Sequence, residues 1–412
     1  MFNKKSSIII ILIILLASIS TINAADNNWP MFQQNIFHNG FVEETSNHIA
    51  NTWTYNIESP IKSTPAIQDG IAYVISSNGI LKAINIEDGS CKWSDDLGTN
   101  IIASPVIQDN ILYIGGEDGY MYAYNIDNQG VTWKFKTSKP IESTAFLTND
   151  SIYFGSNNGH VYKLNIDNGE KIKEYNLTGK ITSSPIIIND TLYVGSTDNK
   201  IYSINTETGE QNWAYTTGDE VKSSPAISNN TLIIGSSDGT LYALNITDGN
   251  IIWKFDTGNK IISSPTIEEY NNNVYIGSDS GSLYCLDLRD GTLKWEYETG
   301  NKIQSTPAIF DNNIVLTSNN GQAYILNKFS GNENLSFNPG SYLFNSPITA
   351  SPVIYGESLI IAGQDGYVYA LNDLKLEAPI TPLNLYTIIT LIVTILLIAL
   401  GVKYIKTKTK NK

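Results

Sequence analysis

Short apolar runs recur along the middle of the chain, and polar turn residues separate them. Residues 221 to 256 show one complete unit of this pattern, with short strand-like segments at 221–227, 231–235, 240–245 and 251–255. The residues between the runs are mainly Ser, Asn, Asp and Gly, which favour tight turns. Short runs bounded by such turns are typical of β-strands, so the pattern predicts four strands per unit.

The unit occurs eight times, and three markers give its period. The first marker is a Ser/Thr-Pro pair, with Pro65, Pro105, Pro185, Pro225, Pro265, Pro307 and Pro352 in the series and Thr144-Ala145 filling its gap. The second is a hairpin turn such as Asn78-Gly79 or Asp238-Gly239. The third is an aromatic residue in the last run of a unit: Trp53, Trp93, Trp133, Tyr175, Trp213, Trp253, Trp295 and Phe337. Four strands in about 40 residues, repeated in this way, predict an all-β protein, an eight-bladed β-propeller with four-stranded antiparallel blades.

The order of the markers predicts how the ring closes. The aromatic strand around Trp53 precedes the first Ser/Thr-Pro segment, and the last unit, 348–372, has three runs and no aromatic fourth. We therefore expect the N-terminal strand to complete the last blade and to leave no open sheet edge. An open solenoid is the alternative, but it would need capping repeats, for which the sequence gives no sign.

Each recurring residue has a predicted place in its blade. Proline has no N–H for a ladder, so the Ser/Thr-Pro segment is predicted as the innermost strand, whose free edge faces the channel. The aromatic residue then lies on the outermost strand, with its ring between neighbouring blades. An Asn or Asp ends the third strand, as at Asn245 and Asp287, and is expected to cap the following turn.

Both ends of the chain carry an apolar run that the repeats lack. Lys4 and Lys5 precede apolar residues 8–17 and a small-residue cleavage point at residues 22–24, the layout of a secretory signal peptide, with an uncleaved anchor as the alternative. Residues 383–402 contain no charge and are long enough to span a bilayer, although a buried core helix is the alternative. Five lysines and no acidic residue follow them, which predicts a cytoplasmic C-terminus.

These features divide the chain into six predicted segments. They are a signal peptide (1–24), a lead-in segment (25–50), the propeller (51–373), a linker (374–382), a C-terminal transmembrane helix (383–402) and a basic cytoplasmic tail (403–412). The predicted protein crosses the cell membrane once, with its propeller outside.

Charge and composition disfavour several classes of function. The chain has 40 acidic against 26 basic residues, and seven of the basic ones lie in the signal peptide and the tail. An exported part this acidic disfavours nucleic acid as a partner, because phosphates bind basic surfaces. Cys91 and Cys285 are the only cysteines and the chain has three histidines, so the sequence predicts neither a disulfide framework nor a metal cluster. Six Asn-x-Ser/Thr sequons are potential glycan acceptors.

The repeat has a recognisable sequence. Residues 235–245, Gly-Ser-Ser-Asp-Gly-Thr-Leu-Tyr-Ala-Leu-Asn, and 247–255, Thr-Asp-Gly-Asn-Ile-Ile-Trp-Lys-Phe, resemble the repeat of pyrroloquinoline-quinone-like (PQQ-like) β-propellers. The resemblance covers about residues 53–372. The lead-in from Trp29 to Gly40 is similar to a segment that precedes such propellers in bacterial and archaeal surface proteins. Tyr175, Phe337 and Ala145 depart from the repeat without changing the family that it indicates.

The resemblance implies two kinds of protein. Quinoprotein dehydrogenases of this family hold a tricarboxylate quinone with cations, stack it between a tryptophan and a vicinal disulfide, and place an acidic base beside calcium. Cys91 and Cys285 are far apart and Arg289 is the only arginine, so no catalytic, cofactor or metal site is predicted. The second kind is the scaffold subunit of outer-membrane protein assembly machines. A C-terminal anchor and the absence of a lipidation cysteine distinguish this chain from it.

One set of positions, just before the proline, varies from blade to blade while its neighbours stay constant, which is where binding specificity can be encoded. The predicted ligand contacts at the channel mouth are Lys62, Glu142, Thr182, Lys222, Gln304 and Thr349, and Ile102 and Ile262 are their equivalents in two other blades. The alternative is that these are tolerant surface positions.

The sequence favours a noncatalytic, membrane-anchored propeller that binds protein or glycan partners. An envelope assembly scaffold is the second hypothesis, and a PQQ-dependent dehydrogenase the third.

Overall fold

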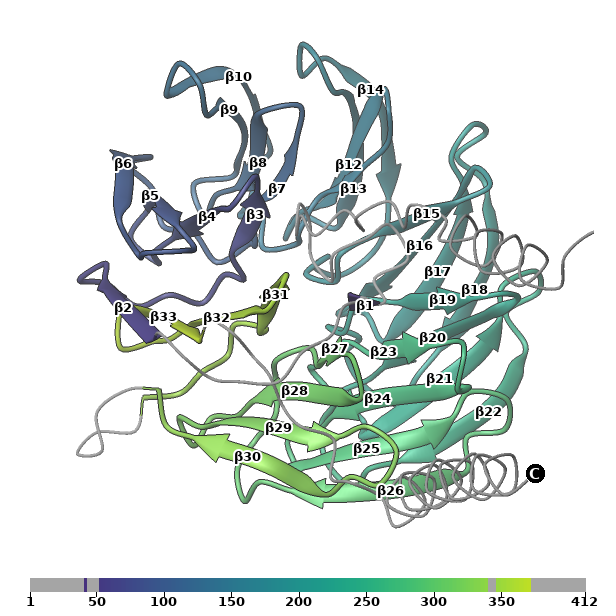
Figure 1. Cartoon of the computed structure of the whole chain (residues 1–412). Coiled ribbons are helices and arrows are strands. Elements are labelled where there is room, and N and C mark those ends of the chain that lie inside the picture. Colours follow the sequence, from purple (N-terminus) through teal and green to yellow (C-terminus); the bar gives the residue numbers. More distant parts are fainter. Residues whose placement is uncertain (1–40, 43–51, 340–345, 372–412) are drawn as a thin grey trace, which may run out of the picture.

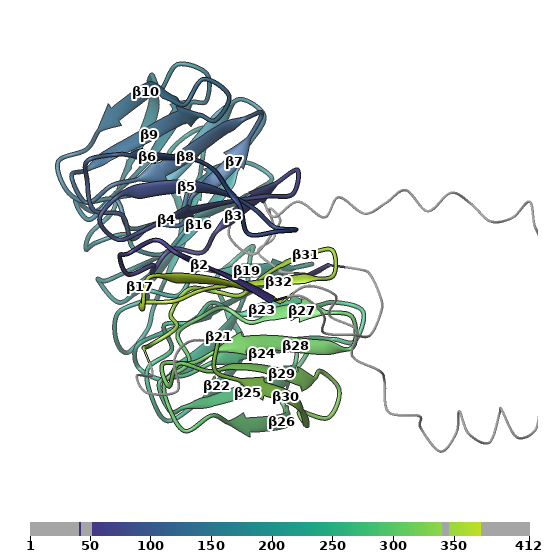
Figure 2. The ribbon, with the colours of Figure 1, turned by 60° about the vertical axis from the view of Figure 1, so that its left-hand side comes forward.

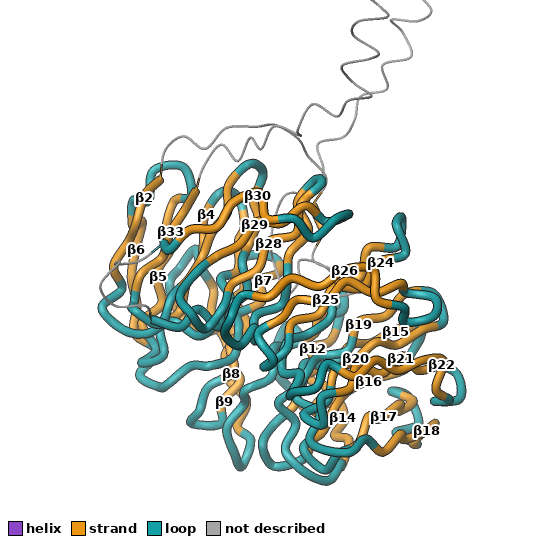
Figure 3. Tube along the Cα trace, turned by 90° about the horizontal axis from the view of Figure 1, so that it is seen from below, coloured by secondary structure: helices purple, strands orange, loops and turns teal. Residues whose placement is uncertain are grey.

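The computed structural model describes residues 41–42, 52–339 and 346–371, which form eight β-sheets arranged in a ring (Figure 1). Each sheet is one blade; seven blades have four strands and one has five. Within these residue ranges the chain consists of strands and turns without a helix (Figure 3). The predicted eight-bladed propeller is confirmed.

The strands of the first four blades follow one another from the channel to the rim. Blade 1 comprises β3 (Ala66–Gln68), β4 (Ile71–Ile75), β5 (Ile80–Asn85) and β6 (Cys91–Asp96). Blade 2 comprises β7 (Val106–Gln108), β8 (Ile111–Gly115), β9 (Tyr120–Asn125) and β10 (Gly130–Lys136). Blade 3 comprises β11 (Phe146–Leu147), β12 (Ser151–Gly155), β13 (His160–Asn165) and β14 (Lys171–Asn176). Blade 4 comprises β15 (Ile186–Ile188), β16 (Thr191–Ser196), β17 (Lys200–Asn205) and β18 (Gln211–Thr216).

The next three blades keep this order, and the last takes its fourth strand from near the start of the chain. Blade 5 comprises β19 (Ala226–Ser228), β20 (Thr231–Gly235), β21 (Thr240–Asn245) and β22 (Ile251–Asp256). Blade 6 comprises β23 (Thr266–Glu268), β24 (Asn273–Gly277), β25 (Ser282–Asp287) and β26 (Leu293–Glu298). Blade 7 comprises β27 (Ala308–Phe310), β28 (Asn313–Thr317), β29 (Ala323–Asn327), β30 (Glu333–Phe337) and the short β1 (Phe41–Val42). Blade 8 comprises β31 (Val353–Tyr355), β32 (Ser358–Ala362), β33 (Tyr367–Leu371) and β2 (Thr52–Asn56).

Strand β2 closes the ring by pairing antiparallel with β33. Trp53 lies opposite Ala370 and Tyr55 lies opposite Val368. Figure 1 shows the purple β2 beside the yellow β33, and in Figure 2 the purple β2 lies next to the yellow strands of blade 8. The predicted closure is therefore confirmed, and it covers the edge that β33 would otherwise expose.

The strand β1 is an element that the sequence did not predict. It lies in the expected lead-in segment and pairs in parallel with β27, with Phe41 opposite Ile309 and Val42 opposite Phe310. The inner edge of blade 7, which we expected to be free, is thus partly occupied.

The innermost strands are shorter than predicted. In blade 5 the predicted strand 221–227 is replaced by β19, which begins after Pro225, so the Ser/Thr-Pro pair precedes the strand. The reason is that the backbone before the proline forms hydrogen bonds with the neighbouring blade. The N–H of Ile61 donates to the carbonyl of Gly363 at 3.1 Å, for example.

The hydroxyl of the Ser/Thr-Pro pair links one blade to the next around the channel. The N–H of Ser184 donates to Ser224 Oγ, and the N–H of Ser224 donates to Ser264 Oγ, both at 2.9 Å. The N–H of Ser351 donates to Thr64 Oγ1 at 3.0 Å and joins the last blade to the first. The same link is seen at three further junctions of the described ring. Each such hydrogen bond contributes about 1 kcal/mol net.

The aromatic residues of the outermost strands dock on the following blade, as predicted. Trp213 Nε1 donates to the carbonyl of Ile246 at 2.9 Å, and the indole ring packs on Gly249. Four other tryptophans repeat this bond, namely Trp53, Trp133, Trp253 and Trp295. Tyr175 replaces the indole with a hydroxyl that donates to the carbonyl of Thr206 at 2.8 Å.

The hydrophobic core consists of layers between neighbouring blades. One cluster joins Ile233 of blade 5 to Val274 of blade 6, and another joins Ile75 of blade 1 to Leu112 of blade 2. The middle strands are covered on both faces, so their sequences are almost continuously apolar. The outermost strands alternate between exposed and covered positions instead.

The predicted signal peptide (1–24), linker (374–382), transmembrane helix (383–402) and tail (403–412), and most of the lead-in, lie outside the described residues and stay predictions. Within the part of the chain that is described, no helix has the length and apolar character needed to cross a bilayer.

Candidate functional site

The turns of the ring lie on two faces. On one face, the loop before each innermost strand contacts the turn between the second and third strands of the blade; the N–H of Glu117 donates to the carbonyl of Asn100 at 2.9 Å. We call this the proline face. The other face carries the turns between the first and second and between the third and fourth strands, where the N–H of Ile86 donates to the carbonyl of Gly70. We call this the acidic face.

The acidic face has most of the net negative charge of the loops and turns. Its turns in the described residues hold sixteen acidic and two basic residues, whereas the loops and turns of the proline face hold ten acidic and six basic residues. The two basic residues of the acidic face, Arg289 and Lys328, are each paired with a carboxylate. The propeller therefore presents one strongly negative face and one of mixed charge.

The structure places all six predicted contact residues at one loop position of the proline face. They are Lys62, Glu142, Thr182, Lys222, Gln304 and Thr349, and all are at least partly accessible. Lys62 lines a pocket of about 260 Å³ between blades 1 and 2, together with Ser77 and Glu117. These residues occupy equivalent positions in their loops, and their role in binding stays a prediction.

Most of these side chains bond to a nearby residue on the same face. Asn157 Nδ2 donates to Glu142 Oε1 at 2.6 Å. Gln364 Nε2 donates to Thr349 Oγ1, and Gln304 Nε2 donates to Asp279 Oδ1, both at 2.9 Å. Lys222 instead forms an ion pair with Glu220 of its own loop at 2.7 Å.

These contacts reveal a second set of variable residues that the sequence reading missed. It occupies the turn between the second and third strands, at Ser77, Glu117, Asn157, Thr197, Ser237, Asp279, Asn319 and Gln364. The signal was available, because these residues recur with the blade period and vary within an otherwise constant turn. We call the two sets together the mouth ring.

A tyrosine of the third strand holds these turns in place. The hydroxyl of Tyr242 donates to Asp238 Oδ2 at 2.6 Å, and burial together with this bond raises the pKa of Tyr242 well above its usual value. Tyr202 makes the same contact with Asp198, and burial and this contact raise its pKa to about 12. The mouth ring is therefore mounted on rigid turns.

Four polar atoms of the mouth ring are buried without a hydrogen-bond partner. They are Ser77 Oγ, Asn157 Oδ1, Thr182 Oγ1 and Asn319 Oδ1; among the described residues, only Ser151 Oγ shares this property elsewhere. Native proteins leave few such atoms unpaired, and each costs about 1–3 kcal/mol. The two amide oxygens can only accept hydrogen bonds, so they fit a ligand that offers N–H or O–H groups.

The residues present do not fit the quinone and calcium that dehydrogenases of this fold use. Cys91 in β6 and Cys285 in β25 are free thiols on blades 1 and 6, so they cannot form a vicinal disulfide. Arg289 lies on the acidic face, where its Nε donates to Asp287 at 2.8 Å, away from the mouth ring. In the ranges that the structure covers, no group of three His, Cys, Asp or Glu side chains is placed to hold a metal ion.

Two family models match the chain, and together they span the propeller. The model described as outer membrane protein assembly factor BamB matches residues 48–190. The model described as the β-propeller of the beta-alanine-activating enzyme matches residues 188–381. No curated protein sequence matches the chain.

Solved structures share the fold at low sequence identity. BamB from Moraxella catarrhalis has a TM-score of 0.65 and 17% identity, and the match covers 79% of this chain and 100% of that chain. Quinohemoprotein alcohol dehydrogenase from Comamonas testosteroni has a TM-score of 0.73 and 14% identity, with 87% of this chain and 82% of that chain covered. The computationally designed protein Ika8 has a TM-score of 0.69 and 16% identity, with 80% and 98% covered. Blade number, repeat sequence and these matches agree, and the chain belongs to the PQQ-like repeat β-propellers.

Proposed function

We propose that the chain is a noncatalytic binding propeller of the cell envelope, and that its mouth ring takes a partner segment rich in hydrogen-bond donors. The observation that carries this proposal is the gathering of four buried, unpaired polar atoms around one channel mouth. Protein backbones and glycans both offer the N–H or O–H groups that these atoms lack. The mixed charge of the proline face, with six lysines among its loops, is compatible with either partner.

Site-specific photo-crosslinking on intact cells tests this proposal. A photoreactive residue would replace Lys62 or Thr182 on the proline face, and Glu207 on the acidic face would serve as the matched control. We expect a protein or glycan adduct from the two proline-face positions and none from Glu207. Absence of an adduct at both proline-face positions, or equal adducts at all three, would contradict it.

Measuring the stability and the partner capture of one variant tests whether the unpaired atoms take part in binding. Thr182→Val removes a buried hydroxyl without a partner, so the free protein should be as stable as before or more stable. The same change should weaken capture of the crosslinked partner. Lower stability combined with unchanged capture would show that the hydroxyl has a structural role only.

An assembly scaffold is the second candidate, favoured by the match of residues 48–190 to the BamB model. The identity of the adduct distinguishes the two, because a scaffold would capture components of an assembly machine and a surface receptor would capture external ligands. The dehydrogenase hypothesis is tested by incubating the chain with PQQ and calcium and measuring cofactor uptake by absorbance. We expect no stoichiometric uptake, because the residues present do not fit the quinone and calcium.

A further inference from the structure

One turn of the acidic face is longer than its counterparts. In blade 6 the turn between β23 and β24 spans residues 269–272, whereas in blade 5 the equivalent turn is only 229–230. Tyr270 lies within it and is 94% exposed, more than any other large apolar side chain among the described residues. Single exposed apolar residues are common on proteins, so the exposure of Tyr270 alone does not indicate a binding site. The contacts that hold its turn in place are the further evidence.

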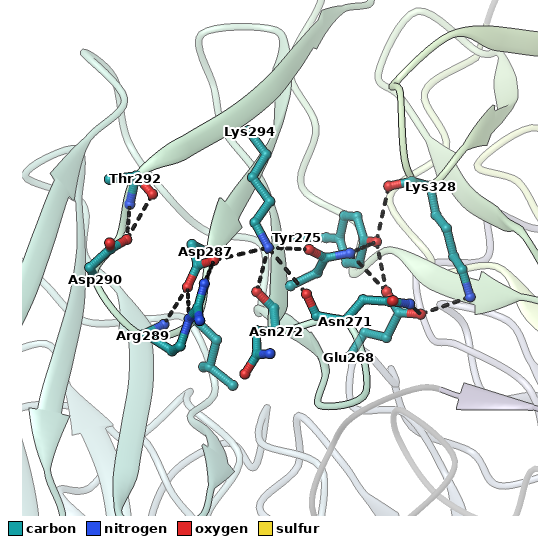
Figure 4. A network of polar contacts seen from close by, with 12 residues as sticks. Glu268, Asn271, Asn272, Tyr275, Asp287, Arg289, Asp290, Thr292, Lys294 and Lys328 are labelled. Atoms are coloured by element: carbon teal, nitrogen blue, oxygen red, sulfur yellow. Dashed lines mark hydrogen bonds and ion pairs between the residues drawn. The ribbon is translucent and has the colours of Figure 1, made fainter.

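A buried carboxylate anchors the base of this turn (Figure 4). Glu268 accepts hydrogen bonds from Asn271 Nδ2 at 2.7 Å and from Asn273 Nδ2 at 2.9 Å. The Tyr275 hydroxyl also donates to Glu268 Oε2, at 3.0 Å, and Lys328 Nζ of blade 7 lies 2.7 Å from Glu268 Oε1. Both members of this ion pair are more than nine-tenths buried, so the base of the turn is fixed to two blades.

Two further contacts hold the rest of the turn. Lys294 Nζ donates to the carbonyls of Asn271 and Asn272 at 3.2 and 2.8 Å, and it is itself paired with Asp287 at 3.2 Å (Figure 4). Ser228 Oγ of blade 5 donates to Glu269 at 2.7 Å. The turn is therefore braced from three blades, while the Tyr270 ring extends into solvent.

A second aromatic ring lies on the adjoining turn of blade 7. Phe329 directly follows Lys328 and is 55% exposed, and the Lys328 ammonium lies 5.2 Å from its ring centroid. Lys328 therefore contacts both Glu268, which holds the turn of Tyr270, and the ring of Phe329. Because the turn that carries Tyr270 is already held in place, binding through its ring does not require the turn to be ordered first, and aromatic side chains contribute strongly to the energetics of protein interfaces.

Charge indicates what would bind there. Glu269, next to Tyr270 in the sequence, and Asp290 are exposed on the same face, and the basic side chains of the network are each held by a carboxylate. The turns of this face hold sixteen acidic residues against two basic ones. Such a surface attracts basic groups and repels nucleic acid and anionic membranes. Arginine and lysine also bind favourably against exposed aromatic rings.

We propose that Tyr270 and Phe329 form an aromatic anchor for a second protein, one that presents arginine or lysine side chains beside an apolar pocket. This interaction is independent of the mouth ring, because it lies on the opposite face. Lys294 acts as a positioning residue that keeps the turn in its binding conformation.

Fluorescence anisotropy on the purified full chain tests the anchor. The probe is a labelled octapeptide of alternating arginine and leucine, and its control is the same peptide with glutamate in place of arginine. We expect the arginine peptide to bind, Tyr270→Ser to weaken binding at least tenfold, and added salt to weaken it further. Ile172→Ser is the matched control, because Ile172 is also an exposed apolar residue, at 52%, but lies on β14 of blade 3.

Several results would overturn the proposal. They are no binding of the arginine peptide, equal binding of the glutamate peptide, or equal affinity of the unaltered chain and Tyr270→Ser. Adsorption to phosphatidylcholine vesicles that is lost in Tyr270→Ser, without peptide binding, would identify a membrane contact instead. Lys294→Met should lower peptide affinity while Tyr270 is kept, and Lys294→Arg should restore part of it.

Discussion

At the scale of single residues, the buried pair Glu268 and Lys328 distinguishes one blade interface from the rest. Elsewhere the position of Lys328 is mostly an apolar residue such as Ile246 or Leu288. Burial alone would raise the pKa of Glu268, but the hydrogen bonds from Lys328 and Asn271 outweigh it and lower the pKa below its usual value. The carboxylate therefore stays charged inside the interface, where it needs its partner.

Removing one member of this pair should destabilise the protein strongly. Lys328→Met leaves an uncompensated buried carboxylate, and we expect a loss of about 3–5 kcal/mol in the free energy of unfolding. The double variant Glu268→Leu with Lys328→Met should recover part of this loss, because two apolar side chains replace the charges. Chemical denaturation measures both. A single variant as stable as the double one would contradict this account.

The pH dependence of stability follows from Asp287. The Arg289 guanidinium, followed by Lys294, holds the pKa of Asp287 far below its usual range. In the unfolded chain the carboxyl takes up a proton near pH 4, so the unfolded state binds protons first as the pH falls. Stability from this group is complete above about pH 5 and is lost progressively below it. Asp287→Asn should flatten the acid side of a plot of denaturation midpoint against pH, and parallel profiles for the two proteins would refute the assignment.

At the scale of elements, each outermost strand is fixed to the next blade by an aromatic ring on a glycine. A Cβ added at Gly249 would lie 2.7 Å from Trp213 Cδ2, and the backbone there has a φ of +73°. Ring and glycine therefore form one interlocking contact between blades 4 and 5.

Gly249→Ala should lower the free energy of unfolding by about 1–3 kcal/mol, because the ring must move and the backbone is strained. Gly258→Ala is a matched control, since Gly258 has the same φ of +73° but no atom within 4 Å of the added Cβ. The difference between the two variants in thermal unfolding measures the lost ring contact. Equal losses would mean that backbone strain alone is responsible.

Local sequence predicted the elements well where their pattern repeats. The second and third strands of blade 5 lie where the apolar runs placed them, at Thr231–Gly235 and Thr240–Asn245. The innermost strands were predicted too long, because the N–H of Ser184 bonds to Ser224 on another blade. A pattern read along one segment carries no sign of such a partner. The parallel strand β1 was missed for the same reason, since it pairs with β27 far along the chain.

The candidate site was half predictable. Variation before the proline pointed to Lys62 and Thr182, whereas the equally periodic variation at the turn position of Asn319 was not recognised as part of a site. Only three-dimensional structure shows that both sets share one face and leave buried atoms unpaired. The ion pair of Glu268 and Lys328 could not be predicted from the sequence either, because each residue alone resembles a solvent-exposed charge.

At the scale of the whole molecule, stability depends on closure of the ring by β2. A chain that begins at Ile57 would lack β2 and expose the edge of β33. We expect it to self-associate through that edge and to unfold at a lower temperature. A chain that begins at Glu43 keeps β2 and loses only β1 among the described strands, so it should elute with the same apparent mass as the unaltered chain. Size-exclusion chromatography and thermal unfolding check both, and a chain from Ile57 with the apparent mass and stability of the unaltered chain would refute this prediction.

Two opposite faces with different charge make the molecule suited to holding two partners at once. The mouth ring lies on the face of mixed charge, and the aromatic anchor lies on the face with sixteen acidic turn residues. Because a rigid ring separates the two sites, binding at one need not change the other. Such an arrangement is compatible with a scaffold as well as with a receptor.

The pairing of β2 with β33 also determines when the ring can close during synthesis of the chain. Asn56 and Tyr367 face each other although they are 311 positions apart, so the strands of the other seven blades are synthesised before β2 can pair with β33. Contacts this distant in sequence slow folding. Until β33 has left the ribosome, β2 has no partner strand and can pair instead with a neighbouring nascent chain.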